Sequence, residues 1–279
     1  MLQGELRTGL RGDALDLAYH GDPVVHAASI TLRPGQVTAL VGPNGSGKST
    51  LLRALARLHK PIAGDVLFDD SGESALALSA RDFARRVTLL AQSRPVPAGV
   101  SVHDVVGYGR HPYRGRWRAD DPDGPRAIAW AMDVTGVSAM ADRAVDELSG
   151  GERQRVWLAT CLAQDTGVLL LDEPTTFLDL RYQVEILDLT RDLADEHGVA
   201  VGVVLHDLDQ AAAVADSVVL LRDGRVVGAG APRDVFTEAA LTDTYGIPVS
   251  VLVDPETGHL STRPVGRHHS RSRTERESV

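Results

Sequence analysis

The sequence contains a single cysteine, Cys161, which excludes an internal disulfide and a zinc site built from cysteines. We expect Cys161 to be a small buried residue of a helix, in a protein kept under reducing conditions. No apolar run approaches the roughly 18 residues that are needed to cross a bilayer. The first residues, Met1–Glu5, also lack the layout of a signal peptide, so we expect a cytosolic chain that reaches a membrane only through a partner.

Basic residues are also fewer than acidic ones. The 279 residues include 29 Lys and Arg against 38 Asp and Glu, which gives a formal net charge of −9 at pH 7. A chain without a basic excess has few cations with which to displace counterions from nucleic acid, so we expect no nucleic-acid partner. Hydrophobic residues make up 43% of the chain, which at this length is enough for one large compound domain or two small ones.

A phosphate-binding pattern is the most informative feature that is present. Residues 42–50 read GPNGSGKST and fit the pattern G-x-x-x-x-G-K-[ST]. The apolar run Val37–Val41 before them predicts a buried strand, and Leu51–Leu58 after them has the pattern of a helix with an apolar face. A glycine-rich turn without a ligand is the alternative, but a Lys-Ser pair between such flanks favours a nucleoside triphosphate site.

Every residue of this loop is a candidate for contact with the nucleotide. The glycines allow successive backbone N–H groups to face phosphate oxygens, and the N-terminus of the following helix adds partial positive charge. Lys48 can reach the β- and γ-phosphates, and the Ser49 hydroxyl can join the Mg²⁺ shell. The candidate nucleotide-binding residues of the loop are Gly42, Pro43, Asn44, Gly45, Ser46, Gly47, Lys48, Ser49 and Thr50.

Short apolar runs alternate with amphipathic stretches along the chain and predict an α/β fold. Further strands are expected at Val168–Leu171, Val199–Leu205 and Ser217–Leu221, the last of which continues through an Asp-Gly turn into a hairpin. Helical patterns dominate residues 93–165, so we expect a helical subdomain inserted into an α/β core, with residues 1–265 forming one domain. The tail, residues 266–279, is rich in Arg, Ser and His and is expected to be disordered, with His268 and His269 solvated rather than bound to a metal.

Two carboxylates end the apolar run Val168–Leu171. Asp172, at the tip of such a strand, can hold Mg²⁺ directly or through water beside the phosphate loop. Glu173 points to the opposite side of the strand end, where it can orient or deprotonate the attacking water. Ordinary solvent-facing charge is the alternative for both residues, but the phosphate loop upstream favours a metal-binding Asp172 and a catalytic Glu173.

Residues 148–159, LSGGERQRVWLA, resemble the signature motif of ATP-binding-cassette (ABC) ATPases. Ser149, Gly150 and Gly151 lead into the N-terminus of a helix, which suits an anion. Ser149 and Glu152 also fit a capping box, so a well-capped helix without a ligand is the alternative, and both interpretations can hold. The resemblance implies that this motif covers the γ-phosphate bound by a second copy of the chain. Glu152 stands where the family most often has Gln, so we expect its carboxylate to turn away from the phosphates.

The resemblance covers roughly residues 15–249 and implies the fold as well: a P-loop ATPase core with an antiparallel β subdomain and an inserted helical subdomain. It implies ATP and Mg²⁺ as the ligands of the site. By the same resemblance Tyr19 stacks on adenine, where a surface tyrosine is the alternative. Gln92 contacts Mg²⁺ or water, although an isolated glutamine at a strand end would predict nothing.

Two further positions match the family in order. Asp179 matches the acidic residue that links the two active sites of a dimer, and its alternative role is to cap the helix predicted from Leu180 to about His197. His206 matches the histidine that hydrogen-bonds the γ-phosphate and positions water, and a buried histidine at a strand end is the alternative. The resemblance therefore implies Glu173 and His206 as the catalytic residues.

Residues 171–183 and 204–212 are most similar to the ATPases of bacterial importers for ferric siderophores, haem and cobalamin, and closest to the ferric-siderophore group. Residues 109–113 and Arg116-Trp117 also resemble this group of ATPases. This resemblance implies a homodimer that encloses two ATP molecules at the cytoplasmic face of the membrane. It also implies two polytopic permease subunits, which contact the surface around residues 92–113, and an external substrate-binding protein. A haem or cobalamin importer ATPase and a soluble ABC ATPase without a transport role are the alternatives, and a solvated face is the alternative for the contact surface.

Overall fold

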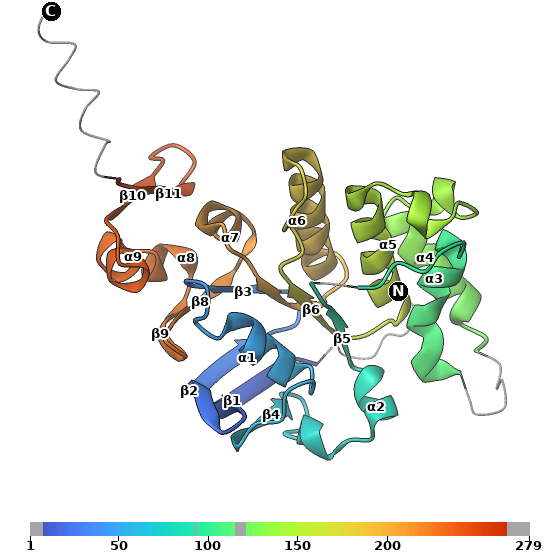
Figure 1. The fold of residues 1–279 in the computed structure, drawn as a ribbon, viewed down its shortest axis with the longest axis horizontal. Helices are drawn as coiled ribbons and strands as arrows, with labels where there is room; N and C mark the ends of the chain where they lie inside the picture. Colours follow the sequence, from blue (N-terminus) through green and yellow to red (C-terminus); the bar gives the residue numbers. More distant parts are fainter. Residues whose placement is uncertain (1–7, 93, 115–120, 267–279) are drawn as a thin grey trace, which may run out of the picture.

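The computed structural model describes residues 8–92, 94–114 and 121–266 (Figure 1). The predictions for Arg116-Trp117, for His268 and His269 and for the tail from residue 267 onward lie outside these residues. Within the described ranges, no helix combines the length and the apolar character that crossing a bilayer requires.

A six-stranded sheet with the order β5-β6-β7-β3-β8-β9 forms the centre of the molecule. The first five strands in this order run parallel, and β9 pairs antiparallel with β8. All residues of β3, β6 and β7 are buried, because elements cover both faces of the sheet. The strands are β3 (Val37–Val41), β5 (Val87–Leu90), β6 (Val168–Asp172), β7 (Ala200–Val204), β8 (Ser217–Arg222) and β9 (Arg225–Gly230).

The predicted strands Val37–Val41, Val168–Leu171, Val199–Leu205 and Ser217–Leu221 are confirmed as β3, β6, β7 and β8 to within one residue at each end. The predicted hairpin is β8–β9, in which Asp223 and Gly224 form the turn with φ values of 47° and 73°. Positive φ at both central residues matches the right-handed twist of the two strands, which explains why Asp-Gly stands there.

One face of the central sheet is covered by α1 (Lys48–Leu55) and by an antiparallel sheet with the order β2-β1-β4. A buried cluster of leucines from β1, β3 and α1 fills the space between the layers. The strands of the antiparallel sheet are β1 (Leu10–Tyr19), β2 (Asp22–Leu32) and β4 (Ala63–Phe68). The predicted β subdomain therefore packs on the side of the sheet that carries the phosphate loop's helix.

The helix after the phosphate loop ends earlier than the sequence predicts. We expected it to reach Leu58, and that boundary is wrong, because α1 stops at Leu55. Arg57 has a φ of 58° and turns the chain, so that the N–H of Ile62 donates to the carbonyl of Asp16 in β1 at 2.9 Å. Leu58 is consequently 68% exposed instead of lying on the apolar face.

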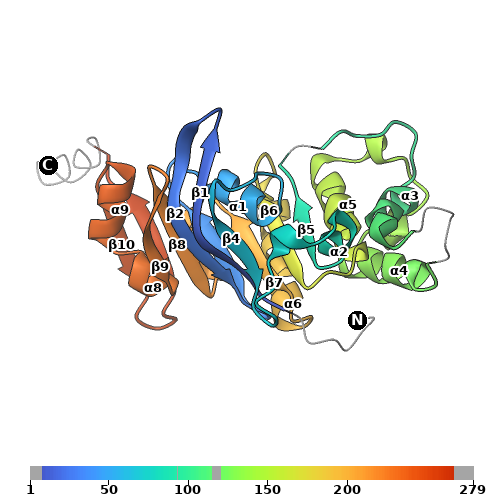
Figure 2. The ribbon, with the colours of Figure 1, turned by 90° about the horizontal axis from the view of Figure 1, so that it is seen from below.

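Helices cover the other face of the central sheet and extend beyond its β5 edge (Figures 1 and 2). They share one large buried cluster with β3, β6 and β7. The helices on this side are α3 (Val102–Gly107), α4 (Gly124–Val134), α5 (Gly150–Ala163), α6 (Leu180–Asp195) and α7 (Leu208–Val214). The predicted helix from Leu180 is confirmed, and it ends at Asp195, two residues before the expected His197.

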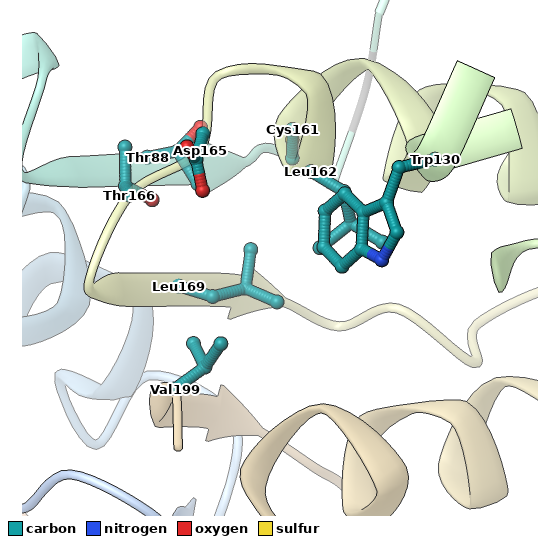
Figure 3. A pocket seen from close by; sticks show the side chains of 8 residues that line it. All are labelled: Thr88, Trp130, Cys161, Leu162, Asp165, Thr166, Leu169 and Val199. Carbon is teal, nitrogen blue, oxygen red and sulfur yellow. The ribbon is translucent and has the colours of Figure 1, made fainter. Parts of the chain in front are cut away.

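Cys161 lies in α5 and is 3% exposed, as the sequence predicts. It borders a cavity of about 10 Å³ that also touches Thr88, Trp130 and Val199 (Figure 3). That volume is at most the space of one water molecule, so the cavity is a packing defect and not a ligand site.

A buried ion pair holds the segment before α4 to the end of α5. The guanidinium of Arg110 meets the carboxylate of Asp121 twice, at 2.7 and 2.8 Å, and donates to the carbonyl of Ala163 at 3.0 Å. The Tyr113 ring lies 3.8 Å from the same guanidinium. Arg110 belongs to a 3₁₀ segment, η2 (Tyr108–Tyr113), which therefore packs as a fixed part of the helical region.

The last described elements lie at the end of the molecule opposite to α3 and α4 (Figures 1 and 2). They are α8 (Pro232–Val235), α9 (Glu238–Tyr245), β10 (Val249–Val253) and β11 (Leu260–Pro264). Arg222, at the end of β8, donates to the carbonyl of Asp243 at 3.1 Å and pairs with its carboxylate, which fixes α9 to the central sheet.

Candidate functional site

Four neighbouring parallel strands bring the candidate residues to one edge of the central sheet. Parallel strands end at the same edge, so the residues that follow β5, β6, β7 and β3 must lie near one another. Gln92 follows β5, Asp172 ends β6 and Glu173 comes directly after it, His206 follows β7 and Gly42 follows β3. The topology therefore collects residues from four distant parts of the chain.

The phosphate loop is shaped by glycines that no other residue can replace. Gly42 has a φ of 145°, and a β-carbon there would lie 2.1 Å from the carbonyl oxygen of Leu221. Gly47, which precedes α1, has a φ of 98°, and its β-carbon would lie 2.8 Å from Val25 in β2. The loop is thus pressed between the end of β8 and the start of β2, with its N–H groups at the N-terminus of α1.

Lys48 is buried at the centre of this loop. Its ammonium group donates to the carbonyls of Gly42 and Pro43 at 2.8 and 2.9 Å. Burial lowers the pKa of Lys48, and the negative charges of Glu173 and Asp172 oppose that shift. The three residues thus lie within electrostatic reach of one another, with a cation between two backbone carbonyls and two acids.

Asp172 is 1% exposed and offers one free oxygen. Its Oδ2 accepts from Arg53 Nη2 at 3.1 Å, while its buried Oδ1 has no hydrogen-bond partner among the described residues. A buried carboxylate oxygen without a partner is costly unless a cation or a water meets it, which suits Mg²⁺. In the described part of the chain, no group of three or more His, Cys, Asp or Glu is placed to hold a metal ion by itself.

The carboxylate of Glu173 is the meeting point of the other candidates. Its Oε1 lies 2.7 Å from His206 Nε2, and its Oε2 accepts from Gln92 Nε2 at 2.5 Å. The Thr176 hydroxyl donates to the same Oε2 at 3.3 Å. The sequence predicted Gln92 and His206 as partners of metal, water and phosphate, and the structure places both against the predicted base.

The signature segment forms the capped start of α5. The Ser149 hydroxyl accepts from the N–H of Glu152 at 3.3 Å, and the Glu152 carboxylate accepts from the N–H of Ser149 at 2.8 Å. The Ser149 N–H also holds the pKa of Glu152 below its usual range. The predicted capping box is confirmed, and the ionised Glu152 side chain is turned toward its own helix and Arg143, at 3.3 Å.

Gly151 is required by a contact with α6. A β-carbon at Gly151 would lie 2.3 to 2.5 Å from three atoms of the Tyr182 ring, whereas one at Gly150 would meet nothing within 4 Å. The Tyr182 ring therefore packs flush on the backbone of the signature segment. The guanidinium of Arg155, one turn further along α5, lies 5.8 Å from the same ring.

This contact predicts that replacing Gly151 by Ala destabilises the protein more than replacing its neighbour Gly150. Gly151→Ala should lower the free energy of unfolding by about 1–3 kcal/mol, because the added methyl group overpacks the Tyr182 ring. Gly150→Ala is the matched control and should change it by less than about 0.5 kcal/mol. Urea denaturation of both variants measures the difference, and equal values would show that the ring does not define the position of α5.

Asp179 stands at the start of α6, and Tyr19 is the last residue of β1. Asp179 caps α6, with its Oδ1 accepting from the N–H of Tyr182 at 3.1 Å, and is exposed. Its capping role is confirmed. Tyr19 ends β1, is 41% exposed and contacts the His59 ring at a centroid distance of 4.5 Å. The next strand, β2, touches the phosphate loop through Val25, so Tyr19 belongs to a hairpin that borders the loop.

Sequence reasoning missed the partners that hold these residues in place. Arg53 lies four residues after Ser49 on α1, on the same helix face, so its position near the site was available from the helical period. Tyr182 and Gln210 gave no comparable signal, because their contacts join segments that the chain brings together only on folding.

The comparisons with known proteins agree with this geometry. A profile of the ABC transporter family matches residues 25–176. The ferric enterobactin transport ATP-binding protein of Escherichia coli (strain K12) is 41% identical over 92% of this chain and 94% of its own length. The iron(3+)-hydroxamate import ATP-binding protein of Bacillus subtilis (strain 168) is 38% identical over 97% of this chain and 98% of its own length. A cobalamin import ATP-binding protein of Halobacterium salinarum is 43% identical over 90% of this chain and 62% of its own length.

Among solved structures, the fold matches a metal-chelate type ABC transporter in an inward-facing conformation. The TM-score is 0.80 at 27% identity, and the match covers 94% of this chain and 98% of that one. The phosphate loop, the two acids at the end of β6 and the capped signature segment all lie within residues 25–176, the range that the family profile matches. The chain therefore belongs to the ABC transporter family, as one of its ATP-binding subunits.

Proposed function

We propose that this chain is the Mg²⁺-dependent ATPase of an importer for ferric siderophores, acting at the cytoplasmic face of the membrane. The observation that carries the proposal is the agreement of five relatives named for enterobactin, siderophore, hydroxamate, achromobactin and petrobactin transport. They are 35–41% identical to this chain over 91–98% of its length.

The chemistry assigned to the site is attack by water on the γ-phosphate of ATP. In this proposal Lys48 and the N–H groups of residues 42–50 bind the phosphates, and Tyr19 stacks on adenine. Ser49, Asp172 and Gln92 hold Mg²⁺, which when bound supplies positive charge to the phosphate oxygens. Glu173 accepts the proton of the attacking water, and His206, now 2.7 Å from its carboxylate, orients that water and the γ-phosphate.

A second copy of the chain completes each site in this proposal. Ser149 and Gly150 are exposed at the N-terminus of α5, and Asp179 is exposed at the N-terminus of α6. Helix N-termini favour anions, so the segment from Ser149 to Gly151 is suited to cover a γ-phosphate bound by the partner. Because Gly151 packs against Tyr182, Asp179 and the signature segment would approach the partner together.

We take residues 1–265 as one ABC ATPase domain in which residues 93–165 form the helical subdomain and the other residues form the α/β core. The permease subunits are assigned to a groove between this core and the helical subdomain. A cavity of about 300 Å³ lies between them, with Phe83 and Leu89 on one wall, Tyr108 and Gln164 on the other, and Arg94 at the segment that follows Gln92. This position supports the prediction that the surface around residues 92–113 contacts the permease, because Arg94 and Tyr108 line the cavity. Gln92, two residues before Arg94 in sequence, bonds the Glu173 carboxylate.

Arginines of a short helix, α2 (Ala80–Ala84), connect the walls of this groove. Arg81 donates to the carbonyls of Pro112 and Tyr113 at 2.8 and 3.3 Å. Arg85, next to the helix, donates to the carbonyl of Pro112 at 3.3 Å. The contacts join the core to η2, so a force applied to the groove by a permease is transmitted to both parts.

Uptake in cells tests the transport proposal. Cells that lack this chain should recover uptake of a labelled ferric siderophore when they carry the wild type, and not when they carry Lys48→Ala, because the loop then loses its buried cation. Lys60→Ala, which removes an exposed lysine beyond α1, is the matched control and should restore uptake fully.

Uptake of labelled cobalamin and haem is measured in the same strains. A cobalamin importer is the second candidate, because a cobalamin import ATP-binding protein is 43% identical to this chain. Loss of cobalamin uptake alone would move the assignment to that compound. Unchanged uptake of all three, with Lys48→Ala protein present at the normal level, would contradict an importer role. The external substrate-binding protein would then have no place in the function.

A further inference from the structure

The loop that carries Glu173 is held in an unusual backbone conformation. Glu173 has a φ of 54° and Phe177 a φ of 64°, and both are left-handed values that non-glycine residues rarely adopt. Such a conformation persists only where the surroundings determine it. The residues from Glu173 to Asp179 therefore need contacts outside the loop to hold the carboxylate in place.

Three glutamines from three different helices make those contacts. Gln154 of α5 donates to the carbonyl of Pro174 at 3.0 Å. Gln183 of α6 donates to the carbonyl of Leu178 at 3.0 Å. Gln210 of α7 accepts from the hydroxyl of Thr175 at 3.2 Å. We call Gln154, Gln183 and Gln210 the glutamine brace.

Two members of the brace are bonded to each other. Gln210 Nε2 donates to Gln183 Oε1 at 2.8 Å. With the bonds at either end, this makes a chain in which each group donates to the next: Thr175 to Gln210, Gln210 to Gln183, and Gln183 to the carbonyl of Leu178. Both ends of the chain lie in the loop, and the chain passes through the first turn of α7 and of α6.

The position of Gln210 relates the loop to His206. Gln210 lies four residues after His206, in the first turn of α7, and its N–H donates to the capping carboxylate of Asp207 at 3.0 Å. The side chain that fixes Thr175 is therefore fixed to the same helix start that presents His206. Thr175 is 8% exposed, so the loss of its bond would leave a buried hydroxyl without a partner.

We propose that the glutamine brace positions the Glu173 loop relative to His206 and to the signature segment, and so sets the rate of the chemical step. The inference rests on the proposed ATPase function of this site. The hydrogen bonds of the brace described above end on Pro174, Thr175 and Leu178, which are not nucleotide contacts, so its loss should lower kcat for ATP and leave KM nearly unchanged. Gln154, Gln183 and Gln210 are positioning residues, acting through the loop.

Steady-state ATP hydrolysis by the purified full-length chain tests this. Thr175→Val keeps the shape of the side chain and removes its hydrogen-bond donor. It should lower kcat about tenfold and change KM less than about twofold, because a misplaced base weakens binding of the transition state more than binding of ATP. Thr175→Ser restores the donor and should recover kcat to within about twofold. Gln210→Leu should resemble Thr175→Val, and the double variant should lose little more, because the groups act as a unit.

Thr190→Val is the matched control, since Thr190 is a buried threonine of α6 whose hydroxyl bonds only its own helix, to Ile186 at 2.7 Å. It should lower stability without changing kcat. Wild-type kcat in Thr175→Val and Gln210→Leu would overturn the proposal, and so would equal losses in Thr175→Val and Thr175→Ser. Glu173→Gln is measured alongside. If it also hydrolyses ATP normally, the proposed function of the site fails. If Glu173→Gln is inactive while the brace variants are fully active, only the proposal about the brace is rejected.

Discussion

Glu173→Gln should lower the rate of ATP hydrolysis by about 10²- to 10⁴-fold, the usual contribution of a general base. The substitution keeps the size of the side chain and its hydrogen-bond acceptor, but it removes the charge that takes the proton. ATP binding should persist, because Lys48 and the phosphate loop do not depend on that charge for their backbone geometry. Single-turnover hydrolysis and equilibrium binding of a fluorescent ATP analogue measure the two effects separately.

A matched control removes the same charge elsewhere. Glu256→Gln changes an exposed residue between β10 and β11, far from the edge that collects Gln92, Glu173 and His206. It should hydrolyse ATP at the wild-type rate. If Glu173→Gln also turned over at that rate, Glu173 would not be the base, and the arrangement of Gln92 and His206 around it would need another explanation.

Asp121→Asn should lower the free energy of unfolding at pH 7 by about 3 kcal/mol, which is typical when one partner of a buried ion pair is removed. The side chains of Arg110 and Asp121 are only 3% and 11% exposed, so the guanidinium would stay buried without its counter-charge. Asp123→Asn is the matched control from the same segment. Asp123 pairs with Arg126 at the surface, where such pairs contribute about 0–1 kcal/mol.

The same pair gives the effect a defined pH dependence. Hydrogen bonds from Arg110 hold the pKa of Asp121 below its ordinary value. A group whose pKa is depressed by folding stabilises the folded state above its unfolded pKa, about 3.9, and loses that contribution as the pH falls through the folded value. The stability difference between wild type and Asp121→Asn should therefore be full at pH 7 and shrink below about pH 4. A difference that is constant from pH 7 to pH 3 would contradict a charge-based contribution.

Much of the candidate site was predictable because it depends on local patterns. The strand before Gly42 and the strand before Asp172 are each a short apolar run, and parallel pairing then places their ends together. The capping box at Ser149 is likewise a four-residue pattern. These features need no knowledge of distant contacts.

The supports of the site could not be predicted in this way. Arg53 and Asp172 are 119 residues apart in sequence, and Gln154 and Pro174 belong to different elements. The end of α1 at Leu55 was missed for a related reason. Leu58 continues the apolar period, but the chain turns at Arg57 because Ile62 pairs with β1, and that pairing outweighs the local pattern.

The arginines of α2 set a condition on any subunit that enters the groove beside them. Three charged hydrogen bonds to Pro112 and Tyr113 span 27 to 32 residues of sequence and fix how far apart the walls stand. Charge-assisted bonds are strong and directional, so an element too wide for the gap would have to break them together. In the permease contact proposed above, an entering loop must therefore match the spacing that these three bonds set.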